Sequence, residues 1–307
     1  MRTLKTAARP LWHPLSWPSW FALALLWLIA QLPHRVSLAI GAVVGPAVLA
    51  LMPRRRRVIA QNLALCFPEW SADERRRVER ENRREAGRML ANFAFVWFAS
   101  DARVAPLPLR IEGLDHLLSA RDAGRGVLLV SAHFSHLELA GRLLAQSLRI
   151  GAMYREHHDP AFEWGVRKLR SRYAQAMFRR DELRSVLRFL KSGGVLWYAP
   201  DQEYRRGDCV FAPFFGIPAS TITATHQLAR MTGAAVIGFG HRREDDGSYS
   251  ITLSRPLENF PSDDVLADTT RVNALIEQAI RRAPEQYLWL HARFKSRPPD
   301  TRPPSLR

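Results

Sequence analysis

The chain has 307 residues, of which 45 are Lys or Arg and 29 are Asp or Glu, so its net charge at pH 7 is +16. Hydrophobic residues make up 47% and charged residues 24%, which excludes a wholly disordered protein and allows a full core. The two cysteines, Cys66 and Cys209, exclude a disulfide scaffold and any C-x-x-C site. Because 41 of the basic residues are arginine, the expected partners carry phosphates: nucleic acid, an anionic membrane face or a phosphorylated substrate.

The N-terminal segment is apolar, since no charged residue lies between Arg9 and Arg35. Its centre reads WFALALLWLIAQL, and three tryptophans lie at or before its start, as in an aromatic belt. We expect residues 1–53 to form a membrane anchor with one crossing or deeply embedded helix, and the arginine run at 54–57 to flank it on the cytoplasmic side. A run of about 16 residues spans only about 24 Å as helix, so a hairpin lying in one leaflet and a buried helix of a soluble protein stay open.

A basic helical segment is expected at 54–105. A first helix over 54–66 ends at Phe67-Pro68, and Ser71 with Glu74 three residues later forms a capping box that opens a second. That helix has a charged half, which is either a solvated face or a phosphate-contacting one, and an apolar half.

From 106 to 307 the pattern changes to alternating strands and helices, which predicts an α/β catalytic domain with a mixed sheet flanked by helices. The expected strands are 109–113, 126–132, 149–154, 194–200, 234–240 and 249–254. The expected helices are 136–147, 160–173, 181–191, 219–231 and 264–282. The aromatic segment 211–220 is read as a packed loop or an acyl-chain wall that opens a helix at Ser220 or Thr221, and the Pro-rich tail from Arg297 as extended chain.

His133 and Glu138 form an H-x4-acid pair just after the apolar strand GVLLVSA. The spacing occurs three times, at His133, His158 and His241, but only the first lies where a strand ends and a helix begins. Residues five apart on a helix point about 140° apart, so the pair can touch only if His133 lies in the turn. Glu138 could then orient the imidazole and leave its other nitrogen as a base, whereas the alternative is a structural histidine beside a helix-capping acid.

Two other chemistries are less favoured at this turn. Ser131 and Ser135 could be nucleophiles, but neither lies in the G-x-S-x-G pattern that exposes a catalytic serine. His133, His136 and Glu138 could bind a metal, but H-x2-H is not the spacing that places two histidines on one helix face. We therefore expect no metal.

Asp201 and Gln202 follow the apolar strand GVLWYAP, so they should reach the same carboxyl edge of the sheet as His133. Arg170 lies in a cluster of basic residues on a predicted helix, which is a solvated face or an anion clamp. We expect this helix to be exposed, and we expect neither Asp201 nor Arg170 to belong to the core.

The run HFSHLELAGR at 133–142 resembles the catalytic block of the lysophospholipid acyltransferase superfamily, and within it the late acyltransferases of lipid A biosynthesis, the lauroyl/palmitoleoyl branch. Further similar blocks are QNLALCFPE (61–69), RIEGLDHL (110–117), APDQEY (199–204), FAPFFGIPA (211–219) and APEQYLWLHARFKSRP (283–298). Together they cover nearly the whole chain in order. The block RRGDCV at 205–210 matches only loosely, and nothing is inferred from it.

The resemblance implies a glycerolipid-acyltransferase-like fold and an enzyme on the cytoplasmic face of the bacterial inner membrane. It would move a fatty acyl group from an acyl carrier protein thioester to a hydroxyacyl chain of the phosphorylated precursor Kdo2-lipid IVA, completing the lipid A part of lipopolysaccharide. His133 is then the general base, Glu138 its orienting carboxylate, and Arg170 and Asp201 supporting or substrate-binding residues. The implied partners are acyl carrier protein, the lipid A precursor and membrane lipids; no cofactor and no nucleic acid are implied.

Three other functions stay open at this stage. A related membrane acyltransferase could use another phospholipid or glycolipid acceptor, and a thioester hydrolase would release free acid instead of an acylated lipid. A membrane-tethered nucleic-acid-binding protein would also explain the charge, although no zinc-finger, helix-turn-helix or RRM signature is present.

Overall fold

The computed structural model describes residues 10–205 and 207–298 and has a seven-stranded sheet at its centre, in the order β1-β9-β8-β2-β5-β3-β4. Only the β8–β9 pair is antiparallel in this sheet, so the expected mixed sheet is confirmed. The strands are β1 (Leu109–Glu112), β2 (Val127–Val130), β3 (Gly151–Tyr154), β4 (Ala176–Arg179), β5 (Val195–Tyr198), β8 (Ala235–Arg243) and β9 (Tyr249–Leu253).

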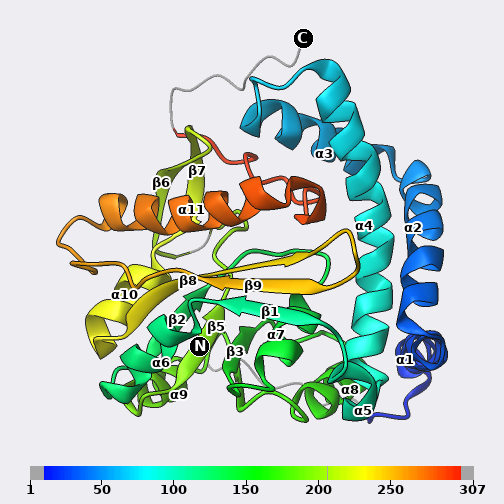
Figure 1. Cartoon of the computed structure of the whole chain (residues 1–307), viewed down its shortest axis with the longest axis horizontal. Helices are drawn as coiled ribbons and strands as arrows, with labels where there is room; N and C mark the ends of the chain where they lie inside the picture. Colours follow the sequence, from blue (N-terminus) through cyan, green and yellow to red (C-terminus); the bar gives the residue numbers. More distant parts are fainter. Residues whose placement is uncertain (1–9, 206, 299–307) are drawn as a thin grey trace.

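Helices cover both faces of the sheet, which is why the central strands are apolar throughout. Leu128 and Val130 of β2 belong to one core that includes residues of α9, α10 and α11, whereas Val127 and Leu129 belong to a second with α6 and α7. Figure 1 shows α11 across one face and α6 and α7 toward the other. These helices are α6 (Leu114–Asp122), α7 (Leu137–Leu144), α9 (Leu183–Lys191), α10 (Ala224–Thr232) and α11 (Val265–Arg282).

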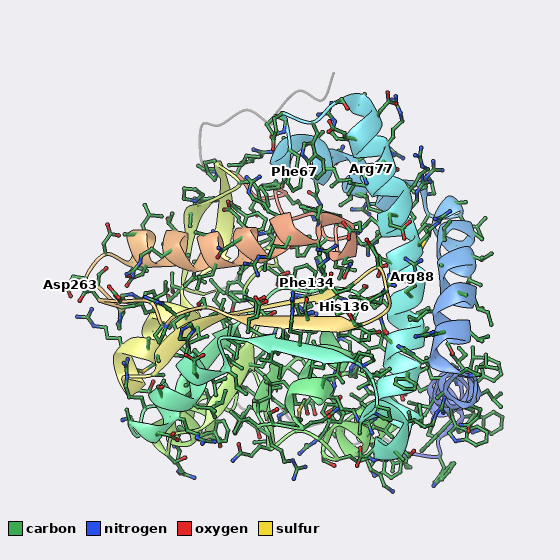
Figure 2. All side chains as sticks on the ribbon, in the orientation of Figure 1. Phe67, Arg77, Arg88, Phe134, His136 and Asp263 are labelled. Carbon is green, nitrogen blue, oxygen red and sulfur yellow. The ribbon has the colours of Figure 1, made fainter. Side chains whose placement is uncertain are left out.

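The long helix α4 (Ala72–Phe98) runs alongside the α/β unit (Figure 1). The predicted capping box is present, since Ser71 Oγ accepts from the Glu74 amide at 3.2 Å and Glu74 Oε2 accepts from the Ser71 amide at 2.7 Å. The apolar half of α4 packs against α7 and α8. In the charged half, Arg88 donates to Glu81 and Glu85 of the same helix, so part of its charge is neutralised internally (Figure 2). The neighbouring helices are α3 (Pro53–Cys66), α5 (Asp101–Val104) and α8 (Pro160–Arg170).

The N-terminal segment forms two helices instead of the one expected, α1 (Trp17–Gln31) and α2 (His34–Ala50), preceded by the turn η1 (Pro14–Ser16). Helix α2 lies against α4 at glycine contacts, because a Cβ added to Gly87 would lie 2.7 Å from the Cα of Gly45. Among the described residues no single helix has the length and hydropathy to span a membrane; α2 and α3 meet that test only as a pair, with a bend of 104° between them. The membrane-anchoring helix over 1–53 therefore stays a prediction.

The segment 211–220 is a β-hairpin and not the loop and helix start expected from the sequence. Strands β6 (Cys209–Phe214) and β7 (Ile217–Ile222) pair around Phe215-Gly216, both of which have positive φ, as in a type I′ turn. Phe214 is fully buried, which favours the packing interpretation of this segment over the acyl-chain wall.

The Pro-rich tail lies outside the described residues from 299 onward. A short turn, η2 (Pro284–Gln286), follows α11.

Candidate active site

The imidazole of His133 lies at the carboxyl edge of the sheet and is bound to Asp201. His133 follows β2 and Asp201 follows β5, and these strands are paired with Val130 opposite Tyr198, so their ends coincide. His133 Nδ1 lies 2.7 Å from Asp201 Oδ1, and the His133 amide donates to Oδ2 at 3.0 Å. The Asp201 side chain is 1% exposed and that of His133 29% exposed. A buried carboxylate thus fixes an imidazole that solvent and ligands can reach.

The electrostatics of this pair favour a base at Nε2 of His133. Burial lowers the pKa of His133, but the charge of Asp201 and the hydrogen bond to it outweigh burial and leave the pKa raised. Burial raises the pKa of Asp201, but the interactions with His133 outweigh it, so this pKa is lowered. An ionised carboxylate only accepts hydrogen bonds, so Nδ1 carries the proton and the Nε2 lone pair is free to accept another.

The C-terminal segment after α11 holds the loop that carries His133. The Leu288 amide donates to the His133 carbonyl at 2.8 Å, and the Ser135 amide donates to the Gln286 carbonyl at 2.9 Å. Between them, Tyr287 forms a β-bridge with Phe134. Burial, and then the charge of Asp201 and a hydrogen bond to it, raise the pKa of the Tyr287 hydroxyl, which therefore stays protonated and donates to that carboxylate. The sequence indicated no role for Tyr287, although it lies in the block 283–298.

Glu138 does not orient His133 in this structure, contrary to the expectation from the H-x4-acid spacing. Glu138 is the second residue of α7 and faces the end of α8. Arg170 donates to both of its carboxylate oxygens, and the hydroxyl of Tyr173, just after α8, donates to it at 2.7 Å. Trp97 Nε1 lies 3.4 Å from the same carboxylate. Burial raises the pKa of Glu138, but the charge of Arg170 outweighs it and the pKa is lowered. The carboxylate therefore joins α4, α7 and α8, while Asp201 takes the position beside the histidine.

Asp201 is buried, so the expectation that it lies outside the core is wrong. Arg170 is half-buried, so its position on the helix is not the fully exposed one that was expected. Of the other basic residues near Arg170, Arg172 donates to the Trp97 carbonyl at 3.3 Å and Lys168 lies over the Trp164 ring. The basic cluster is thus partly structural and not simply a solvated face or an anion clamp.

The other two histidines of the repeated spacing differ from each other. His158 is exposed, as a histidine without a site would be. His241 is buried, and its Nδ1 lies 2.9 Å from Nε2 of His136, which ends the loop that carries His133 (Figure 2). Burial, followed by the nearby charge of Arg243, lowers the pKa of His136 to about 3, so this residue is neutral. A change at His241 would disturb the support of the loop, and only His158 can serve as a neutral control.

The two serines near His133 are also structural. Ser131 is buried, and its hydroxyl lies 3.5 Å from the carbonyl oxygen of Ala132. Ser135 donates to the buried carboxylate of Glu85, and its carbonyl accepts from Asn92 at 3.0 Å. Neither hydroxyl is bound to the His133 imidazole, which agrees with the low weight given to serine catalysis.

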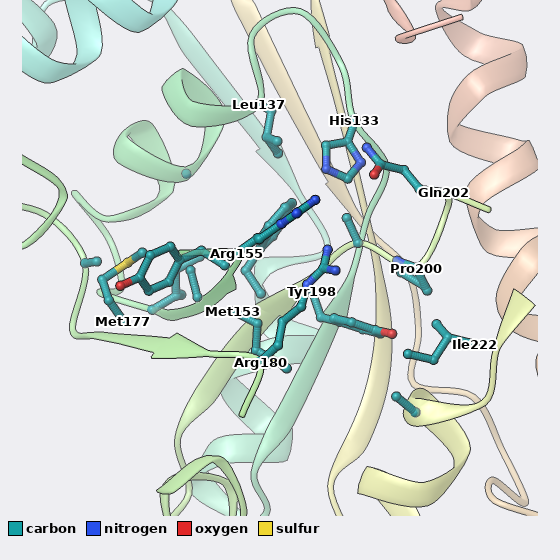
Figure 3. A pocket seen from close by; sticks show the side chains of 18 of the residues that line it. His133, Leu137, Met153, Arg155, Met177, Arg180, Tyr198, Pro200, Gln202 and Ile222 are labelled. Atoms are coloured by element: carbon teal, nitrogen blue, oxygen red, sulfur yellow. The ribbon is translucent and has the colours of Figure 1, made fainter. Parts of the chain in front are cut away.

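A cavity of about 760 Å³ opens beside His133. Apolar side chains line much of it, among them Leu137, Met153 and Met177, while Arg155, Arg180 and Gln202 reach into the space around the imidazole (Figure 3). Trp197 Nε1 and the Tyr198 hydroxyl also belong to lining residues, and both atoms are buried with no hydrogen-bond partner among the described residues. The arrangement suits a ligand with a long apolar part and a polar or anionic group next to the base. Arg180 follows the basic cluster that the sequence analysis considered as an anion clamp, whereas the sequence pattern gave no reason to single out Arg155.

Comparison with known proteins agrees with a site for a ligand that has a long apolar part. Residues 4–296 match the family model described as bacterial lipid A biosynthesis acyltransferase. The chain is 39% identical to the lipid A biosynthesis palmitoleoyltransferase of Escherichia coli K12, over 95% of both chains. It is 37% identical to the lauroyltransferase of the same organism, over 97% of this chain and 98% of the other. The crystal structure of the 1-acyl-sn-glycerophosphate acyltransferase PlsC from Thermotoga maritima aligns with 83% of this chain and 99% of its own, with 11% identity and a TM-score of 0.36, too distant for a comparison of residues.

Proposed function

Because the chain belongs to the bacterial lipid A biosynthesis acyltransferase family, we propose that it transfers a fatty acyl group from acyl carrier protein to a hydroxyacyl chain of the phosphorylated precursor Kdo2-lipid IVA. That it is an acyltransferase follows from the family; the donor, the acceptor and the membrane location are the proposal. One observation carries it: the His133–Asp201 pair lies at the edge of a largely apolar cavity of about 760 Å³. This places a base beside a space suited to a hydrocarbon chain.

The geometry supports direct transfer. Nε2 of His133 takes the proton of the acceptor hydroxyl as the oxygen attacks the thioester carbonyl, and the carbon–sulfur bond breaks when the tetrahedral intermediate collapses. The imidazolium then returns the proton to the departing thiolate. Asp201 stabilises the imidazolium between these steps, as a carboxylate does in other histidine pairs. A thioester is already activated, so the proposed reaction needs no cofactor.

The basic residues around the imidazole fit anionic substrates. Arg155 and Arg180 line the cavity and lie near His133 in Figure 3. Arginine binds phosphate through parallel hydrogen bonds, so these residues are suited to the phosphates of a lipid A precursor or to the phosphopantetheine of the carrier. Acyl carrier protein is acidic, which would complement the net charge of +16.

The outer face of the N-terminal helices supports a location at the inner membrane. Trp17, Phe21 and Leu28 of α1 and Val43 and Val48 of α2 are large apolar residues exposed in the structure. Large apolar side chains exposed in this number on neighbouring helices indicate an interface with lipid or protein. The exposed arginines at 54–57 follow directly and would meet anionic headgroups on the cytoplasmic side.

Mass spectrometry of the products tests the proposal. The purified protein in detergent is mixed with an acyl carrier protein thioester and Kdo2-lipid IVA. We expect a lipid heavier by one acyl group and an equal amount of free carrier. Free fatty acid in place of acylated lipid would identify a hydrolase. Unchanged precursor together with acylation of another phospholipid or glycolipid would move the function to a different acceptor.

A further inference from the structure

The cavity beside His133 reaches below the edge of the sheet along β3. Its lining includes Tyr154 at the end of β3, Ala152 in the middle and Ile150 just before the strand begins. Four strand residues cover about 13 Å, so the cavity is deep as well as wide. The carbonyl of Ile150 accepts from the Gln175 amide at 2.8 Å, which joins β3 to the segment leading into β4 at this inner end.

Helix α7 forms a second wall of the same space. Leu137, Glu138 and Gly141 all line the cavity, as expected because Gly141 lies four positions after Leu137 and three after Glu138 on the helix. Gly141 lies four residues beyond Leu137, or about 6 Å farther from the catalytic loop along the helix. Gly141, Ala152 and Ala174 are among the small residues of this lining.

Glycine at 141 is not required by the backbone or by packing. Gly141 is in a helix and is not among the positive-φ residues of the described chain. No heavy atom outside its own helical turn and chain neighbours lies within 4 Å of where its Cβ would be. Gly87, by contrast, is in a helix where the backbone of α2 leaves no room for a Cβ. Because glycine inside a helix costs about 0.5–1 kcal/mol relative to alanine, its presence in α7 calls for another explanation.

We propose that Gly141 is a specificity-determining residue whose missing side chain leaves the inner end of the cavity open to the last methylene groups of the donor acyl chain. The inference rests on the proposed acyl transfer. It adds that the wall formed by α7 determines which length of donor acyl chain the cavity accepts. The distance of about 13 Å along β3 accommodates roughly ten methylene groups of an extended chain. A larger side chain at 141 would occupy this inner space and leave the catalytic pair untouched.

The test is the chain-length profile of Gly141→Leu compared with wild type. Saturated acyl carrier protein thioesters that differ by two carbons are assayed for kcat/KM with one acceptor. Each methylene that loses its place in the cavity weakens binding about fourfold, so exclusion of two should lower the ratio of long-chain to short-chain kcat/KM about 15-fold. Ala152→Val, on the facing strand, should change the ratio in the same direction. Gly141→Ala should change it little, and Gln146→Leu, an exposed position after α7, not at all.

The same chain-length profile can also overturn the inference. An equal loss of kcat/KM at every chain length, or an unchanged ratio in both Gly141→Leu and Ala152→Val, would overturn it. If Gly141→Leu does not fold, Ala152→Val still reports the ratio, together with Gly141→Val as the smaller substitution at position 141. If wild-type protein transfers no acyl group at all, the proposed function fails instead, and dissociation constants for free fatty acids of increasing length then test the cavity by itself. If Gly141→Leu weakens the binding of long fatty acids more than that of short ones, the role of Gly141 is retained. If it weakens both equally or neither, that role is refuted.

Discussion

Replacing Asp201 with asparagine isolates the charge that the structure places beside the base. The side chain keeps its shape but can turn its amide N–H toward Nδ1 of His133, which favours the tautomer with the proton on Nε2 and so blocks the base. The charge that raises the pKa of His133 is also lost, while the burial that lowers it remains. We expect kcat to fall about 10²–10⁴-fold, the range found for general-base catalysis and for Asp-to-Asn changes at histidine pairs.

The assay is the pH dependence of kcat/KM. The neutral imidazole is the active form, so wild-type activity should increase as the pH rises through the raised pKa of His133. In Asp201→Asn the plateau should be lower, and the acid limb should move to lower pH because burial now dominates. A limb that stays in place, or an unchanged plateau, would refute the assignment of Asp201 as the partner of the base.

The pH dependence of the free energy of unfolding tests the His133–Asp201 pair independently of activity. The raised pKa of His133 contributes stability that is fully present below its unfolded value of 6.5 and is lost as the pH rises through the folded value. The lowered pKa of Asp201 contributes stability present above 3.8 and lost as the pH falls through the folded value. The difference in free energy of unfolding between wild type and Asp201→Asn should therefore be largest between pH 3.8 and 6.5 and decrease at alkaline pH, as measured by urea unfolding.

Three further outcomes are expected. Tyr287→Phe removes a donor to the carboxylate partner of the base and should lower kcat by about tenfold with KM little changed, whereas a change in KM alone would argue against this role. Glu138→Gln leaves the half-buried guanidinium of Arg170 with a neutral partner and should lower the free energy of unfolding by about 2–4 kcal/mol, somewhat less than for a fully buried pair. Arg170→Ala should be much less than additive to it in a double-mutant cycle, and full additivity would contradict the pair. Changing Phe21 (72% exposed) and Leu28 (56% exposed) together to glutamine should reduce flotation with anionic vesicles at unchanged Tm, and equal flotation would remove α1 from the membrane interface.

The central strands could be predicted because they are buried on both faces and read as continuous apolar runs, as in VLLV and VLWY. The hairpin β6–β7 could not, because Pro213 and Pro218 argue against strands and yet face each other as a pair in a two-stranded ribbon. Strand β4 was missed since its apolar run, AMF, is only three residues long and all four residues of the strand are half-buried.

The candidate site, too, could be predicted from the sequence only in part. The apolar strands before His133 and Asp201 indicated that both side chains reach one edge of the sheet, and the structure places them in contact. Which carboxylate orients the imidazole could not be read from the sequence. Spacing along the chain favoured Glu138, but the fold turns that residue toward Arg170 on α8. Tyr287 reaches the site from a segment more than 80 residues away, through a β-bridge that no local pattern predicts.

The most direct test of the account is the single-turnover rate of acyl transfer for His133→Ala beside wild type, with exposed His158→Ala as the matched control. Transfer to Kdo2-lipid IVA is followed by mass spectrometry, and circular dichroism verifies that each variant is folded. We predict a fall of at least 10²-fold for His133→Ala and a near wild-type rate for His158→Ala. A folded His133→Ala protein that transfers the acyl group at the wild-type rate would contradict the account, because the base would then lie elsewhere.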